Sequence, residues 1–139
     1  MAEALFVLSP NPLLDRPPFV LPVSVGAIVC FEGVVRDNNE GKSVLRLEYS
    51  AYAELAEREG ARIVHDAVGR FGLSAAACIH RIGVLEPGEV AVRAWAAAAH
   101  RGEAFAACAF IIDGVKASVP IWKREDYRDG ERAWVGCEC

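Results

Sequence analysis

The sequence predicts an α+β fold with a mixed or mostly antiparallel sheet and two main helices. Most short apolar segments read as strands, whereas two long segments repeat their apolar residues every three or four positions, as helices do. The resulting order, β-β-β-α-β-β-α-β, is typical of α+β folds. At 139 residues, with 53% hydrophobic and 24% charged residues, we expect a single domain spanning 1–139.

The N-terminal part is predicted to consist of strands and connections. A first strand covers 4–8, and the proline-rich segment 9–25 is expected to be an irregular connector. The next strand, 26–35, is interrupted by Gly33 as at a bulge. A polar loop follows, and 43–50 alternates like the returning strand of a hairpin-like pair with 26–35.

The first helix is predicted at 52–71, with Gly72 as its end. Strands are expected at 75–82 and 89–97, joined by a turn at Pro87-Gly88. A last strand is expected at 132–137.

The second helix is predicted at 101–118, because its apolar residues follow the spacing of a core-facing helix. Lys116 lies in its last turn and Pro120 ends it. The apolar face is expected to comprise Ala104, Phe105, Cys108, Ile111, Ile112 and Val115.

Charge is distributed unevenly along the chain. The net charge is −4, but 100–124 holds four Lys/Arg and two Asp/Glu, a local net of +2. This basic segment in an acidic protein predicts an anionic ligand. The acidic balance argues against general nucleic-acid binding, and no apolar run is long enough to span a membrane. Without a basic N-terminal signal region, we expect a cytoplasmic protein.

The five cysteines show no C-x-x-C spacing. Cys30, Cys78 and Cys108 lie among apolar residues and are expected to be buried, reduced thiols. Cys137 and Cys139 form a C-x-C pair near the end of the sequence. Because the three histidines are scattered, we expect neither a metal site nor a cofactor.

Lys116 and Lys123 are the first candidates for chemistry. Two ammonium groups near one site disfavour each other's charge, so such a lysine can transfer protons near neutral pH. The alternative for Lys116 is a solvated lysine that stabilises the helix C-terminus. For Lys123, the flanking Trp122 and Pro120 favour a partly covered position.

His100 and Arg101 lie at the predicted N-terminus of the second helix, where backbone N–H groups attract anions. They can equally be solvent-exposed residues. Arg101 and Lys116 are fifteen residues apart, roughly 22 Å along one helix. If both belong to one pocket, they must come from different copies of the chain, as in a two-fold dimer.

Other basic residues outside that helix are weaker candidates. Arg36 lies in a loop, where it can contact an anion. His80 is expected to be a core histidine, and Arg81 to form a structural ion pair.

Several separated motifs, in order, resemble the large, catalytic subunit family of molybdopterin synthase. They are G-A-I-V-C-F-E-G-V-V-R, I-H-R-I-G, A-H-R-G-E-A-F and K-A-S-V-P-I-W-K-R-E, and together they cover most of the chain. The resemblance implies an α/β-hammerhead-like fold. It also implies a sulfurtransferase of molybdenum cofactor biosynthesis, which converts cyclic pyranopterin monophosphate (precursor Z) into molybdopterin by building its dithiolene.

The resemblance implies a partner that supplies the sulfur. This is a small ubiquitin-like carrier with a C-terminal Gly-Gly thiocarboxylate, and two carriers dock on a homodimer of large subunits to form a heterotetramer. Because this sequence ends E-C, we expect it to be the acceptor enzyme.

The resemblance also assigns residue roles. Lys116 and Lys123 would be catalytic, and His100 and Arg101 would come from the second subunit. The implied substrate contacts are Val34, Val35, Arg36, His100, Arg101, Lys116, Lys123, Arg124 and Glu125.

Two other functions remain open. One is a sulfurtransferase that carries a persulfide on its own cysteine, which requires an exposed thiol of low pKa. The other is a non-catalytic α+β module that binds an anionic metabolite, since fold alone does not establish catalysis.

Overall fold

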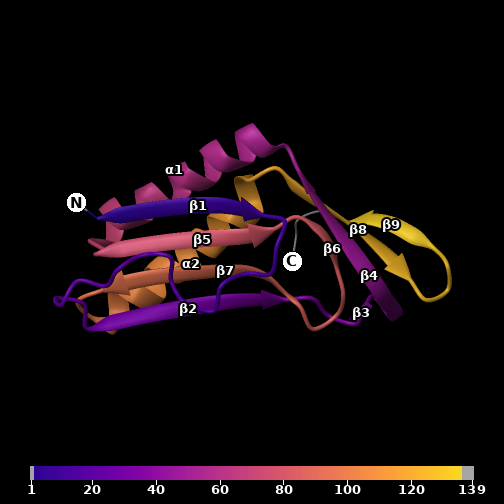
Figure 1. The fold of residues 1–139 in the computed structure, drawn as a ribbon, viewed down its shortest axis with the longest axis horizontal. Helices are drawn as coiled ribbons and strands as arrows, with labels where there is room; N and C mark the ends of the chain where they lie inside the picture. The colour runs from indigo at the N-terminus through magenta and orange to yellow at the C-terminus, as the bar shows by residue number, and fades with distance from the viewer. Residues whose placement is uncertain (1, 136–139) are drawn as a thin grey trace.

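The computed structural model describes residues 2–135 of the chain. It confirms an α+β fold with two main helices (Figure 1). The elements are β1 (Glu3–Ser9), β2 (Ala27–Val34), β3 (Asn38–Asn39), β4 (Lys42–Ala51), α1 (Ala53–Phe71), β5 (Ala75–Arg81), β6 (Gly83–Leu85), β7 (Val90–Ala98), α2 (Arg101–Ser118), β8 (Ile121–Tyr127) and β9 (Arg132–Val135).

The first sheet has the strand order β1-β5-β7-β2 and is mixed. Strands β1 and β5 pair in parallel, and the other two pairs are antiparallel. Helices α1 and α2 pack on one face of this sheet (Figure 1). Buried alanines dominate β5 and β7, and such small side chains let the helices lie close to the sheet.

The contact between α1 and β1 depends on Gly60. A Cβ on this residue would lie 2.3 Å from the ring of Phe6, so only glycine leaves room for the ring. The helix ends at Gly72, whose φ of 63° is the left-handed conformation favoured at helix C-termini. The predicted limits of this helix are therefore confirmed to within one residue.

The proline-rich connector covers the opposite face of the first sheet. Leu13 and Phe19 pack against Ala77, Ile79 and Trp95. The Arg93 side chain also donates hydrogen bonds to the carbonyl oxygens of residues 13 and 14. This segment therefore has a structural role, although it has no regular secondary structure.

The second sheet lies beyond one end of the first and is antiparallel (Figure 1). Its order is β3-β4-β8-β9, with β6 also paired to β4. The expected pairing of 26–35 with 43–50 is wrong, since β2 pairs with β7. The loop forms its own tight β3–β4 turn through Glu40 and Gly41, both with positive φ.

Two further expectations need correction. Phe105 is 61% exposed, because the buried stripe of α2 runs through Ala104 and Ala107 instead. Cys30 is exposed, since β2 is an edge strand whose side chains alternate between interior and solvent. Of the expected last strand, the part beyond Val135 lies outside the described residues, as do Cys137 and Cys139.

In the described part of the chain, neither helix has the length and apolar character needed to cross a membrane.

Candidate active site

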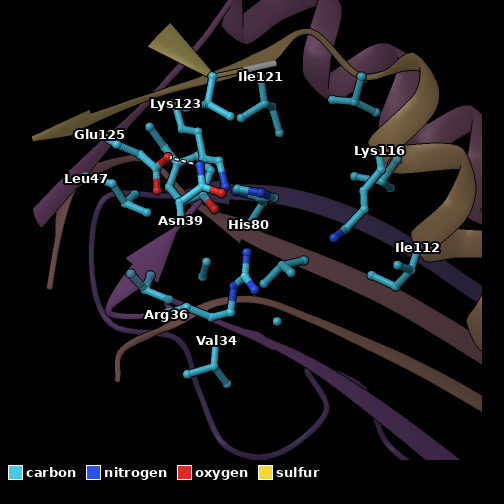
Figure 2. Close-up of a pocket in the computed structure, with 18 of the residues that line it drawn as sticks. Val34, Arg36, Asn39, Leu47, His80, Ile112, Lys116, Ile121, Lys123 and Glu125 are labelled. Atoms are coloured by element: carbon cyan, nitrogen blue, oxygen red, sulfur yellow. Dashed lines mark hydrogen bonds between the residues drawn. The ribbon is translucent and has the colours of Figure 1, made fainter. Parts of the chain in front are cut away.

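A cavity of about 390 Å³ lies where the first sheet meets the second sheet and the C-terminal end of α2 (Figure 2). Its walls are largely apolar, with a small number of polar groups, as is usual for small-molecule sites. The apolar lining includes Val34, Val35, Leu47, Ile112, Val115 and Ile121.

Three cationic side chains point into the cavity from different parts of the chain (Figure 2). Arg36 follows β2, Lys116 lies in the last turn of α2, and Lys123 lies on β8. Glu125 is the one carboxylate among the described residues that line the cavity, so three cations and one anion give a net of +2. The site therefore favours an anionic ligand on a protein whose total charge is −4.

Strand β8 sets which side chains reach the cavity, because successive residues of a strand face opposite sides. Lys123 and Glu125 line the cavity, whereas Arg124 does not. The Arg124 guanidinium instead lies 3.4 Å from carboxylate oxygens of both Glu48 and Asp126. The structure thus separates Arg124 from the other predicted contacts on this segment.

Arg36 reaches the cavity because it lies just after the end of β2. The register with β7 shifts between Gly33 and Val34, which confirms the expected bulge. A Cβ on Gly33 would lie 2.6 Å from a methyl group of Val92, so glycine allows the close approach. Beyond the bulge, the N–H of Val35 donates to the carbonyl of residue 89 at 2.9 Å and fixes the backbone just before Arg36.

His100 and Arg101 lie in a different place, at the N-terminal end of α2. They line a shallow hollow with Gly26, Ala27 and Ala99. Lys116 is near the opposite end of the same helix, so one small ligand cannot reach both groups within one chain. The structure therefore does not bring His100 and Arg101 to the cavity of their own chain.

Comparison with known proteins agrees with this architecture. The model of the family described as MoaE protein matches residues 17–118. The chain belongs to the MoaE family.

Relatives in this family are similar over most of the chain. A molybdopterin synthase catalytic subunit from Pyrococcus abyssi is 50% identical over 112 residues, covering 81% of this chain and 75% of that protein. The one from Oryza sativa subsp. indica is 46% identical over 112 residues, covering 81% of this chain. This alignment spans only 58% of the rice protein's length.

Solved structures share the fold. Molybdopterin synthase from Staphylococcus aureus superposes with a TM-score of 0.85 and 32% identity, covering 98% of each chain. A complex of subunits 1 and 2 of the molybdopterin-converting factor from Helicobacter pylori has a TM-score of 0.68. The matched chain of that complex is 21% identical to this one, and the match covers 81% of this chain and 73% of the matched chain. At this identity the match shows a similar fold and no more.

Several polar residues that line the cavity of this MoaE chain, including Asn39 and His80, are not among the predicted site residues. Asn39 donates from Nδ2 to Oε1 of Glu125 at 2.6 Å. The Tyr127 hydroxyl donates to the same oxygen at 3.3 Å, so the 4%-exposed carboxylate of Glu125 is held by two donors. His80, expected to be a core histidine, is buried but also lines the cavity. Asn39 ends the two-residue strand β3 and His80 lies within β5, and their position at the cavity depends on sheet contacts that the sequence does not reveal.

The described cysteines do not form a reactive or metal-binding group. Burial raises the pKa of the Cys108 thiol to about 11 and also raises that of Cys78. The pKa of Cys30 is raised by partial burial and by Glu32. Within residues 2–135, no three His, Cys, Asp or Glu side chains are grouped to hold a metal ion.

Proposed function

We propose that this chain is the catalytic subunit of a molybdopterin synthase. It would transfer sulfur from the thiocarboxylate of a small carrier subunit to cyclic pyranopterin monophosphate, and so form the dithiolene of molybdopterin. The observation that carries the proposal is the convergence of Arg36, Lys116 and Lys123 on one cavity in a chain of the MoaE family.

The cavity suits a phosphorylated ring compound. Its apolar walls can cover a flat heterocycle, and its cations can bind the phosphate and the carrier's thiocarboxylate. Arg36 offers a planar guanidinium for paired hydrogen bonds to phosphate oxygens. Val34 is 52% exposed at the rim, where it can contact the entering ligand. We assign these contacts to Val34, Val35, Arg36, Lys116, Lys123 and Glu125.

Lys116 and Lys123 would act on the sulfur-transfer steps. The thiocarboxylate sulfur attacks a carbon of the pyranopterin side chain, and the oxygen bound there leaves. Lysine ammonium groups stabilise the negative charge on the departing oxygen and can supply its proton. Water then hydrolyses the acyl–sulfur link, which leaves the sulfur on the pterin and a carboxylate on the carrier.

The complete site would require a second copy of the chain. His100 and Arg101 lie too far from the cavity of their own chain, and an N-terminal helix end with an arginine is suited to bind an anion. In a two-fold dimer, this end of one chain would complete the cavity of the other. Small carrier subunits would dock on that dimer. The Helicobacter pylori chain of similar fold was solved in a complex of two different subunits. With reduced thiols such as Cys78 in its core, the protein would act in the cytoplasm.

Product formation tests the proposal. The purified chain is mixed with cyclic pyranopterin monophosphate and the thiocarboxylated carrier, and molybdopterin is measured as its fluorescent oxidation product. Wild type and a variant with all five cysteines replaced by alanine or serine are both expected to form product. Loss of activity in the folded cysteine-free variant would favour a persulfide carrier. Tight binding of the pyranopterin without any product would favour the binding module.

A further inference from the structure

His80 brings a polar group that can be uncharged into a cavity that also holds three cations. Its Nδ1 lies 2.7 Å from the carbonyl oxygen of Arg81. A carbonyl oxygen only accepts hydrogen bonds, so Nδ1 must carry the proton. In a neutral ring the other nitrogen, Nε2, is then a hydrogen-bond acceptor.

The ring is held in a fixed orientation. Tyr49 packs against it edge to face, with ring centroids 4.8 Å apart and an interplanar angle of 83°. Nδ1 is the ring nitrogen that bonds to the backbone, and His80 lines the cavity. In the view of Figure 2 the ring lies between Lys123 and Lys116.

The environment keeps this imidazole neutral. Burial is the main cause that lowers the pKa of His80 to about 4; the bond to the Arg81 carbonyl opposes it, and the charge of Lys116 adds to it. Near neutral pH the ring therefore adds no charge to the site. It is also a weak base, so it is suited to accept a hydrogen bond and not to remove a proton.

Glu125, the carboxylate among the described lining residues, already has two donors on one of its oxygens. Glu125 accepts from Asn39 and Tyr127 through the same oxygen. Arg36, Lys116 and Lys123 are donors only and can bind the anionic part of a ligand. A donor group on the ligand's ring can therefore bond to Nε2 of His80, a neutral acceptor whose ring is held in a fixed orientation at the cavity wall.

We infer that His80 is a substrate-contacting residue whose Nε2 accepts a hydrogen bond from an N–H or O–H group on the ring system of the phosphorylated substrate. The inference rests on the proposed function for the identity of that substrate. It assigns ring recognition to His80 and anion recognition to the three cations. A phosphate ester without a ring donor should not use this contact.

Calorimetric titration with two probes tests the assignment. Cyclic pyranopterin monophosphate has ring donors, and phenyl phosphate has a phosphate on a ring without them. His80→Phe keeps a planar ring against Tyr49 and removes the acceptor, whereas His80→Gln retains an acceptor oxygen. Unpaired donors on a bound ligand are costly, so His80→Phe should weaken pyranopterin binding about tenfold or more. His80→Gln should recover part of that loss, and phenyl phosphate should bind wild type and His80→Phe equally.

Unchanged pyranopterin binding in His80→Phe would overturn the inference. An equal loss of both probes would also overturn it, because it would show that His80 only maintains the shape of the cavity. If wild type binds the pyranopterin but does not turn it over with the carrier, the proposed function fails while the titration still decides the role of His80. If wild type does not bind the pyranopterin, both fail together.

Discussion

The side chain of Asn39 donates a hydrogen bond to the buried carboxylate of Glu125 across 2.6 Å. The two residues are 86 positions apart in sequence, one on the short strand β3 and the other on β8. This bond connects the segment that follows β2 to β8, the strand that contains Lys123. Arg36 and Lys123, which enter the cavity from these two segments, therefore have a fixed relative position.

Asn39→Ala should lower the free energy of unfolding by about 1–2 kcal/mol, because it removes a donor from a buried carboxylate. Asn38→Ala is the matched control, since the Asn38 amide bonds only to the exposed neighbour Asp37 among the described residues. Urea denaturation of both variants measures the difference. Equal stability of the two variants would show that the Asn39–Glu125 bond contributes nothing.

His80 should make stability depend on pH. Its pKa is near 6.5 in the unfolded chain and is lowered to about 4 in the fold, mainly by burial. Between these values the unfolded state binds the proton preferentially, so stability is full above pH 6.5 and falls as the pH decreases towards 4. The linked loss is about 3 kcal/mol. Denaturation of wild type and His80→Phe from pH 7 to pH 4 should show this loss in wild type alone; parallel curves would contradict it.

Gly60→Ala should destabilise the fold by about 1–3 kcal/mol, because the added methyl group meets the Phe6 ring at 2.3 Å. Gly69→Ala lies in the same helix with nothing within 4 Å of the added Cβ. That control should be stabilising by roughly 0.5–1 kcal/mol through helix propensity. Thermal unfolding separates the two, and a Gly60→Ala protein as stable as the control would refute the close packing of α1 on β1.

Complementation tests whether two chains share each site. Lys123→Ala and His100→Ala homodimers should both have low activity, since every site in them lacks one group. Dissociation and random reassociation of the pair would form heterodimers with one intact site each, and about one quarter of wild-type activity should return. The control mixture, Lys123→Ala with Lys116→Ala, should regain none because both groups come from one cavity. Failure of the first mixture to regain activity would contradict a site shared between two chains.

Much of the secondary structure could be predicted because its signals are local. Helix α2 has a continuous apolar stripe, a lysine in its last turn and Pro120 after it, and its predicted limits match the structure. The bulge at Gly33 was also indicated by a single glycine in an apolar strand. Phe105 was assigned to the wrong face because alanines, and not large side chains, fill the helix–sheet contact.

The division into two sheets could not be predicted, because strand pairing depends on long-range contacts. β8 was not expected, since Trp122, Lys123 and Arg124 give no apolar alternation. Successive side chains of β8 nevertheless face opposite sides, and for this reason Lys123 lines the cavity while Arg124 lies on the other face. The spacing of Arg101 and Lys116 on one helix did predict their separation, since helix length follows directly from residue number.

In the proposed function, two lysines of one cavity carry the sulfur transfer. The chain has three lysines, and the third, Lys42, lies outside the cavity and pairs with Asp129 and Glu131. Lys42→Ala is therefore a control of the same residue type, expected to keep nearly full activity because exposed ion pairs contribute little.

The most direct measurement is the rate of molybdopterin formation from cyclic pyranopterin monophosphate and the thiocarboxylated carrier by wild type, Lys42→Ala, Lys116→Ala and Lys123→Ala. We expect both cavity variants to lose about a hundredfold in rate or more while they keep their fold and oligomeric state. If both cavity variants turn over substrate as fast as Lys42→Ala, the assignment of catalysis to this cavity is wrong.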